Sequence, residues 1–282
     1  MSLLYRRISR LPNYLRAFGL VRGLILLFRV ERNLAKESNR LKSYDVPWAR
    51  APIWLRETIS DHAIFWQNIV RRHYEVAHFP HAQRLMATYA AILKAGRRPV
   101  ILDCGGNIGL SAIWFAVKFP EARVLVVEPE PRNFELLVRN VAPYRNTVEP
   151  LQGGIWPRAG RLAITNPKSG ASAFQVQAET DPGSDSVRAF TIDDLLRMAE
   201  STEAFIVKLD IEGSQRTLFE ENTDWVGRCH LIILELDDWL FPWAGTSRSF
   251  FRCISRLPFE YLIAGEHIFC FRDFSESIGA DH

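Results

Sequence analysis

Charged side chains alternate along one short segment of the sequence that is suited to acid–base chemistry. Lys208, Asp210 and Glu212 follow an apolar run at residues 204–207. Alternate residues of an extended segment point to one side, and three charges at a buried strand end are costly unless they are paired or used. Asp210 is therefore the candidate base or acceptor-orienting group, and a well-placed base contributes about 10²–10⁴-fold to a rate. Glu212 shares that role or holds the start of the next helix, and the positive charge of Lys208 balances the two carboxylates. The alternative is that the three side chains form a charge network that only stabilises the loop.

A glycine-rich turn precedes this segment in the chain. Residues 103–109 read Asp-Cys-Gly-Gly-Asn-Ile-Gly. Glycine permits a sharp turn and a close approach of the backbone to a ligand. The turn does not match the dinucleotide fingerprint GxGxxG, because Cys104 stands where the first glycine would be. The Asp103 carboxylate would repel a pyrophosphate and would suit a cationic ligand end such as an amino group. A tight strand–helix turn without a ligand is the alternative.

A second acid, Glu128, ends the apolar run at residues 124–127 and is followed by Pro129. An acid at this point of an α/β unit can accept hydrogen bonds from both hydroxyls of a ribose. The alternative is a helix cap or a solvated acid. The turn, its carboxylate and a ribose-binding acid together suit S-adenosylmethionine better than a nicotinamide cofactor, because this molecule has an adenosine and an amino-acid tail but no phosphate.

Further polar and aromatic residues follow the strand predicted at "LIILEL". Glu235 and Asp237 are candidates to line an acceptor pocket or to bind a metal with Asp210, but no tight Asp/His cluster demands a metal, and we predict none. Trp239 belongs to an aromatic loop that could stack on a sugar or simply join the core. His267 is a second candidate base, although a lone histidine is more often structural.

The elements that must position these residues begin near residue 98. Short apolar runs alternate from there with amphipathic helices, which predicts a parallel sheet with helices on both faces. Ligands of such sheets lie at the carboxyl ends of the strands. We expect three parts: a helical N-terminal extension with a basic arm (1–97), a catalytic domain (98–273) and a tail (274–282). Residues 51–97 in particular are expected to be helical.

The second part resembles the FkbM-type methyltransferases, a branch of the class I S-adenosylmethionine-dependent enzymes. Four blocks and a closing hairpin carry the resemblance: "ILDCGGNIGLSA", "VVEPEPRNFELLVRNV", "TIDDLL", "IVKLDIEGSQRTLF" and "EHIFCFRD". The resemblance implies a Rossmann-like α/β sheet of seven strands, mostly parallel, with the last strand antiparallel. It also implies roles for single residues. The turn that holds the cofactor would be formed by Asp103, Gly105, Asn107 and Gly109. Glu128 would bind the ribose, and Asn133 would support the loop that follows Glu128. The adenine would lie beside Gln152 and Gly153.

The resemblance, rather than the composition, also implies an oxygen acceptor. We expect O-methylation of a hydroxyl on a small molecule, a glycan or a lipid-linked sugar, with Asp210 or Glu212 positioning or deprotonating it. Two alternatives stay open. The chain could be a non-catalytic binding or membrane-associated partner protein that keeps the cofactor fold, or a nicotinamide oxidoreductase, which the missing first glycine disfavours.

The charge distribution separates the N-terminal arm from the body. Residues 1–50 contain 11 Lys and Arg against 3 Asp and Glu, whereas the remaining residues contain 24 against 29. A mildly acidic body argues against a nucleic-acid groove. Residues 17–30 are apolar but are cut by arginines, so they are too short to span a membrane. We expect a cytoplasmic protein in which residues 13–42, with a helix beginning near Pro12, pack on the body or contact the membrane surface.

Overall fold

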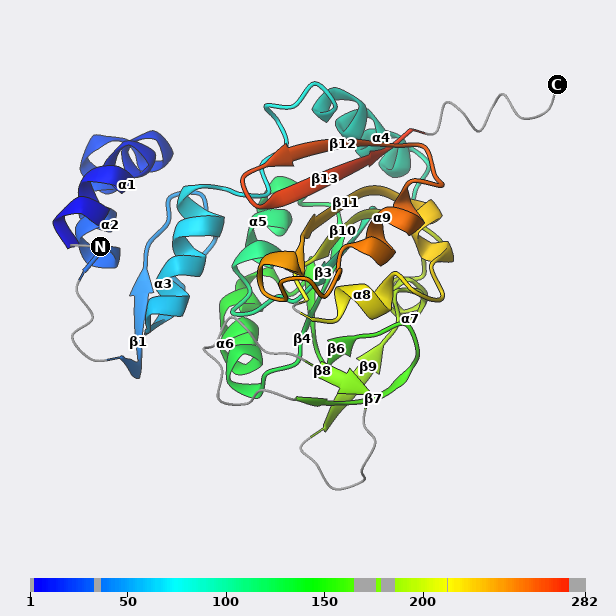
Figure 1. The fold of residues 1–282 in the computed structure, drawn as a ribbon. Coiled ribbons are helices and arrows are strands. Elements are labelled where there is room, and N and C mark those ends of the chain that lie inside the picture. The colour runs from blue at the N-terminus through cyan, green and yellow to red at the C-terminus, as the bar shows by residue number, and fades with distance from the viewer. Residues whose placement is uncertain (1–2, 33–36, 165–175, 179–185, 212, 274–282) are drawn as a thin grey trace.

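The computed structural model describes residues 3–32, 37–164, 176–178, 186–211 and 213–273 (Figure 1). Its centre is a seven-stranded sheet in the order β12-β13-β11-β10-β3-β4-β5. The strands are β3 (Val100–Cys104), β4 (Arg123–Glu128), β5 (Val148–Gln152), β10 (Ala204–Leu209), β11 (Cys229–Glu235), β12 (Phe259–Ala264) and β13 (His267–Arg272). Only β13 runs antiparallel to both of its neighbours, and the other pairs are parallel. The predicted sheet is confirmed, including the antiparallel last strand.

Helices cover both faces of this sheet because its strands are apolar on both sides. Every residue of β3 and β10 is buried, as expected for parallel strands between two helical layers. Ile101 belongs to the core under one layer, whereas Val100 and Leu102 belong to the core under the other. The first layer contains α4 (Ala82–Lys94), α5 (Leu110–Lys118), α6 (Pro131–Val141) and the short helix η2 (Ala142–Tyr144). The second contains α7 (Ile192–Met198), α8 (Gln215–Leu218), η3 (Asp224–Arg228) and α9 (Arg248–Ile254).

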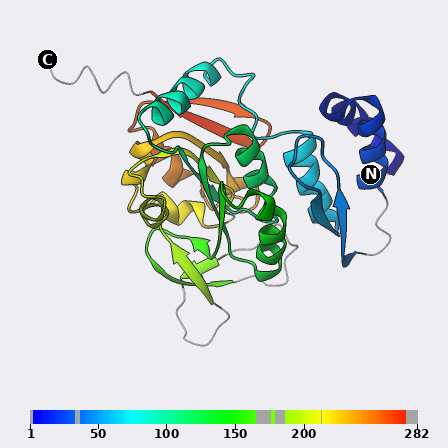
Figure 2. The ribbon, with the colours of Figure 1, turned by 180° about the vertical axis from the view of Figure 1, so that it is seen from behind.

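A smaller sheet stands beside the second layer. Its strands β6 (Gly154–Ile155), β7 (Gly160–Ile164), β8 (Val176–Ala178) and β9 (Ser186–Phe190) pair in the order β6-β9-β7-β8. In the views from both sides it lies at the far end of the molecule from α4 (Figures 1 and 2).

The N-terminal extension contains helices and one strand pair. Besides α4, which covers the main sheet, its helices are α1 (Leu3–Phe18), α2 (Leu20–Val30), α3 (Ile59–Phe65) and the π-helical turn η1 (Trp66–Val70). The strand β1 (Ser38–Tyr44) pairs with β2 (Ile53–Glu57). The helical prediction for residues 51–97 is thus wrong at β2, because β1 supplies a pairing partner that no local pattern reveals. In Figures 1 and 2, β1 and α3 lie between the α1–α2 pair and the main sheet.

The arm before β1 also differs from the single helix predicted to begin near Pro12. Pro12 lies inside α1, and Gly19, with φ of 75°, separates α1 from α2. Their buried residues, Tyr14 and Leu26 among them, join the same core as α5 and α6. The arm is therefore packed on the body. Within the described ranges, no helix is long and apolar enough to cross a membrane.

Candidate functional site

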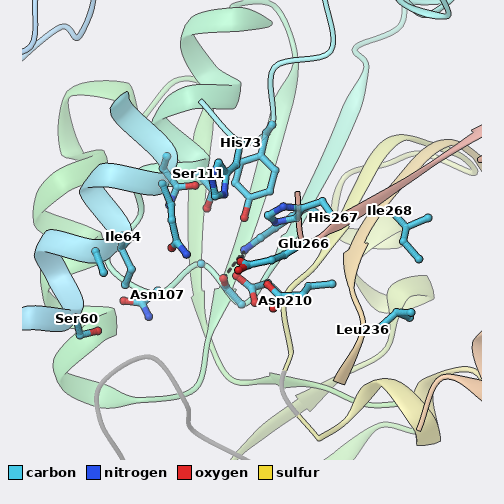
Figure 3. A pocket seen from close by; sticks show the side chains of 18 of the residues that line it. Ser60, Ile64, His73, Asn107, Ser111, Asp210, Leu236, Glu266, His267 and Ile268 are labelled. Carbon is cyan, nitrogen blue, oxygen red and sulfur yellow. Dashed lines mark hydrogen bonds and ion pairs between the residues drawn. The ribbon is translucent and has the colours of Figure 1, made fainter. Parts of the chain in front are cut away.

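A cavity of about 690 Å³ opens at the carboxyl ends of β3, β10 and β11. Its walls come from the β3–α5 turn, from α3 and η1 of the N-terminal extension, and from the start of β13 (Figure 3). Cavities that bind small molecules have volumes of about 300–1,000 Å³, and α/β sheets bind ligands at this edge. The edge predicted from the strand pattern is therefore the edge that carries the cavity.

The charges predicted at the ends of β3 and β10 lie side by side because Asp103 and Lys208 are register partners. Lys208 Nζ is 2.9 Å from Asp103 Oδ1, and the Ser111 hydroxyl donates to Asp103 Oδ2 at 2.6 Å. The side chain of Asp103 is fully buried and does not line the cavity. A carboxylate so deeply buried needs partners within the protein, and Lys208 and Ser111 supply them. The cofactor-binding role of Asp103 stays a prediction.

Lys208 and Ser111 line the cavity where Asp103 does not. Lys208 Nζ also donates to the Gly105 carbonyl oxygen at 2.5 Å and lies 3.5 Å from Asp210 Oδ2. Burial by itself would lower the pKa of Lys208, but the charges of Asp103 and Asp210 outweigh it and raise that pKa. Lys208 therefore stays a cation and ties the glycine turn to the segment after β10.

The glycine turn itself depends on one close approach. Gly105 has a φ of 86°, and a Cβ built on it would lie 1.9 Å from the Asp210 carbonyl oxygen. Only glycine fits there. Asn107 also has a positive φ, of 48°, and Gly109 caps the N-terminus of α5 in the left-handed conformation. Asp210, Gly105 and Asn107 all line the cavity.

Glu128, the predicted ribose-binding acid, is buried at the end of β4 and lies outside the lining of this cavity. Its carboxylate accepts hydrogen bonds from the backbone N–H groups of Asn107 at 2.8 Å and Glu130 at 3.0 Å, and from the Asn133 side chain. Burial raises its pKa to about 7, although these hydrogen bonds act in the opposite direction. Its ribose-binding role stays a prediction.

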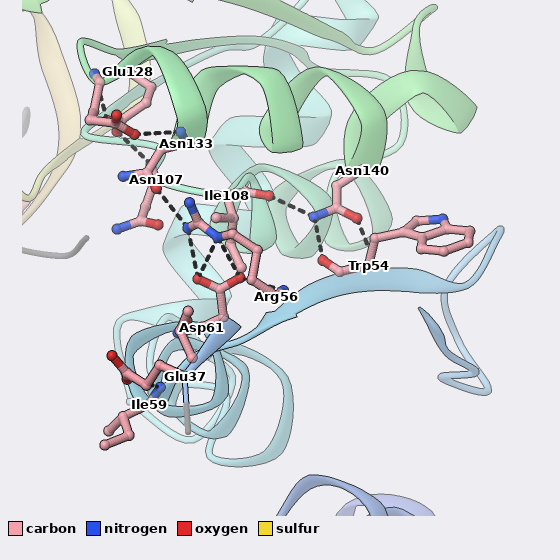
Figure 4. A network of polar contacts seen from close by, with 12 residues as sticks. Glu37, Trp54, Arg56, Ile59, Asp61, Asn107, Ile108, Glu128, Asn133 and Asn140 are labelled. Atoms are coloured by element: carbon pink, nitrogen blue, oxygen red, sulfur yellow. Dashed lines mark hydrogen bonds and ion pairs between the residues drawn. The ribbon is translucent and has the colours of Figure 1, made fainter. Parts of the chain in front are cut away.

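Asn133 connects Glu128 to the N-terminal extension (Figure 4). Arg56 of β2 donates through Nη2 to Asn133 Oδ1 at 2.7 Å, and the same nitrogen lies 2.7 Å from Asp61 Oδ1. Asp61 is fully buried, and its backbone N–H donates to the Thr58 side chain, which caps α3. Arg56 was not predicted as a site residue; its one signal in the sequence is a charged residue directly after the apolar run "IWL".

Further acidic side chains and two histidines lie around the same cavity. Asp210, Glu235 and Glu266 line it together with His73 and His267, whose ring centroids are 5.4 Å apart (Figure 3). Burial, followed by the charges of Asp210 and Glu266, raises the pKa of Glu235 to about 7. Burial lowers the pKa values of both histidines, that of His73 to about 4. Glu235 is thus a carboxyl group with a pKa near neutrality.

Several predicted residues lie elsewhere. Asp237 accepts a hydrogen bond from the Gly213 N–H at 3.0 Å and does not line the cavity, whereas Trp239 does line it and is 66% exposed, so it is not a core residue. Gln152 pairs with Glu128 at the strand end, and Gly153 packs against β9. Neither lines this cavity. Glu212 lies outside the described residues.

The order of the seven strands and the glycine turn after β3 are those of the class I methyltransferase architecture. The family model described as "Methyltransferase FkbM domain" matches residues 103–252. The chain belongs to this family. The match covers the turn, the β4 acid and the segment after β10, but it leaves out the N-terminal extension.

Two curated relatives are methyltransferases by name. Methyltransferase sdnD of Sordaria araneosa is 29% identical over 131 residues, which cover 46% of this chain and 40% of the relative. Hexuronic acid methyltransferase AglP of Haloferax volcanii is 28% identical over 138 residues, which cover 49% of this chain and 55% of the relative. The chain thus spans about half the length of these relatives.

Two of the solved structures with a similar fold are the following. Precorrin-6y C5,15-methyltransferase from Geobacter metallireducens has a TM-score of 0.34 and 14% identity, over 62% of this chain and 81% of that one. TYW2 of P. horikoshii, solved with MeSAdo, has a TM-score of 0.37 and 12% identity, over 84% of this chain and 73% of that one.

Proposed function

We propose that the chain is an S-adenosylmethionine-dependent methyltransferase that acts on the oxygen of a neutral, hydroxyl-rich acceptor. The observation that carries the proposal is one cavity whose wall combines the backbone of the Gly105 turn with the carboxylates of Asp210 and Glu235. Family membership supports methyl transfer, and the wall chemistry supports the kind of acceptor.

The residues present fit the proposed cofactor. The cavity reaches the backbone of Gly105, Gly106 and Asn107, so a ligand can lie against the turn. Its lining carries three carboxylates, and its lysine is already paired with Asp103. Such a wall suits a ligand with a sulfonium and an amino group. Glu128 would hold the ribose from beside Asn107, with Gln152 and Gly153 toward the adenine.

The protein's own residues have two tasks in this reaction, to align the acceptor and to remove its proton. S-adenosylmethionine, when bound, supplies a methyl group that its sulfonium has already activated. The protein must align the acceptor hydroxyl, where proximity contributes roughly 7–11 kcal/mol, and must take its proton. Glu235 is the better proton acceptor, because its pKa of about 7 is near the working pH. Asp210 orients the hydroxyl, and its charge keeps the pKa of Glu235 raised.

The acidic wall also restricts the acceptor. AglP is named for hexuronic acid, which carries a carboxylate of its own. In this chain Asp210, Glu235 and Glu266 would repel a further carboxylate beside the reacting hydroxyl. Exposed Trp239 offers an apolar ring to the face of a sugar. A neutral sugar hydroxyl, free, in a glycan or linked to a lipid, therefore fits better than a uronic acid.

The test uses the full chain with methyl-labelled S-adenosylmethionine and three acceptor sets: neutral glycosides, uronic acids and amines. We expect label in the neutral glycosides, in a form stable to alkali because it is an ether, and loss of transfer in Glu235→Gln. Alkali-labile label on uronic acids, or label on amines, would refute the acceptor class. Cofactor binding without transfer to any acceptor, including those of a cell extract, would favour a non-catalytic protein.

A further inference from the structure

One face of α2 exposes an apolar stripe to solvent. The stripe consists of Leu20, Val21, Ile25 and Phe28, which are 51–68% exposed. At about 100° per residue these positions share one side of the helix. In Figures 1 and 2, α1 and α2 lie at the periphery of the molecule. Contiguous exposed apolar surface of this kind marks an interaction site.

The opposite face of α2 holds the helix in place without help from the stripe. Leu26, Leu27 and Val30 are buried in the core. A Cβ built on Gly23 would lie 2.7 Å from the Tyr14 carbonyl oxygen, so α1 and α2 pack very closely there. The stripe is therefore not required for the packing of the helix.

The surface around the stripe is cationic. Arg16, Arg22 and Arg29 are exposed. The only acid in residues 1–32 is Glu31, which is buried and pairs with Arg6 at 3.1 Å and Arg10 at 2.7 Å. An apolar stripe flanked by arginines, with no exposed acid on either helix, has the composition of an interfacial helix.

We propose that α2 docks this stripe on an anionic lipid surface and lies in its plane. The helix has 11 residues and so is about 16 Å long, too short for a hydrocarbon core of about 30 Å. A second copy of the chain is the weaker occupant. In a symmetric dimer the same patch faces itself, which would bring the exposed arginines of both copies together.

The docking helix α2 packs on α1 at Gly23, and α1 in turn contacts the cavity wall. The rings of Tyr14 and Trp66 lie 5.6 Å apart, and Arg10 stacks over Trp66 at 4.4 Å. Trp66 begins η1, which places Gln67 and Asn68 in the cavity lining. If the proposed function holds, lipid docking keeps the cavity near a lipid-linked acceptor; the docking itself does not depend on that function.

The experiment is sedimentation of the full chain with vesicles of phosphatidylcholine, with and without phosphatidylglycerol. We expect binding to the anionic vesicles that weakens with salt. Arg22→Gln should lower the affinity for anionic vesicles about fivefold, since one arginine near such a surface contributes about 1 kcal/mol. Ile25→Ser with Phe28→Ser should reduce binding below detection.

The matched control is Met86→Ser with Val138→Ser, two apolar side chains that are each 40% exposed on α4 and α6. This control should bind as the unchanged chain does, and circular dichroism should show that every variant is folded. Absence of binding to anionic vesicles, equal binding to neutral ones, or unchanged binding by the Ile25/Phe28 variant would overturn the proposal. So would a dimer in sedimentation equilibrium that the same variant dissociates, because the stripe would then be a contact between copies.

Discussion

The two walls of the cavity treat their charges in opposite ways. At the glycine turn, Asp103 and Lys208 are almost wholly buried and each has a close partner. Glu235, at the end of β11, is partly exposed, and Glu266, just before β13, is exposed. Burial, followed by the charges of Asp210 and Glu266, raises the pKa of Glu235 to about 7. The wall at the glycine turn is stabilised by the Asp103–Lys208 ion pair, whereas the wall at the end of β11 contains Glu235, the proposed proton acceptor. Structure and chemistry are thus divided between two strand ends of one sheet.

The largest effect, on the free energy of unfolding, is expected at the buried Asp103–Lys208 pair. Lys208→Met leaves the Asp103 carboxylate buried without its cation, which costs about 3–5 kcal/mol of unfolding free energy. Urea denaturation measures this loss. The control Arg216→Met breaks an exposed pair between Arg216 of α8 and Glu220, just after that helix, and should cost less than about 1 kcal/mol. Equal losses in both variants would show that the buried pair does not hold the wall.

At the second wall, a change should affect catalysis and leave stability nearly unchanged. Glu235→Gln removes the proton acceptor but keeps its size, so kcat should fall about 100-fold or more with the same cofactor affinity and the same unfolding midpoint. Steady-state kinetics with the acceptor that the labelling experiment identifies measures this kcat. A kcat within a few-fold of the unchanged enzyme would remove Glu235 from the mechanism.

A smaller effect is expected where the N-terminal extension reaches Glu128. Asn133→Ala breaks the link between Arg56 and Glu128 and should weaken S-adenosylmethionine binding about tenfold, in line with a hydrogen bond to a charged group. Asn140→Ala is the matched comparison, because Asn140 lies on the same helix and bonds the backbones of Trp54 and Ile108 but not Glu128, so it measures the loss of a buried asparagine that does not reach this acid. Titration calorimetry compares them, and equal affinities would limit Asn133 to a structural role.

The smallest effect is a shift of a pH profile. Because Glu235 must be ionised to accept a proton, kcat/KM should rise with pH through about 7. Asp210→Asn removes a negative charge that helps to raise this pKa, so the rise should move to lower pH, by less than one unit, together with a lower kcat. An unmoved profile would show that Asp210 and Glu235 do not interact.

The sheet and the turn could be predicted because their signals are local. Apolar runs mark strands, and the spacing of Gly105 and Gly109 marks a turn. The partner of Asp103 could not be predicted, because Lys208 meets it only through the pairing of β10 with β3. The same reason hid Arg56, which reaches Asn133 across a contact between the extension and α6. Burial, which raises the pKa of Glu235, is likewise a property of the folded chain.

The most direct test of the account is titration of S-adenosylmethionine into the full chain and into Glu128→Gln, with a nicotinamide dinucleotide as the comparison ligand. The account predicts saturable binding of S-adenosylmethionine with one site per chain, at least about tenfold weaker in the variant, and no heat with the dinucleotide. Binding of the dinucleotide alone, or S-adenosylmethionine binding that the variant leaves unchanged, would contradict it.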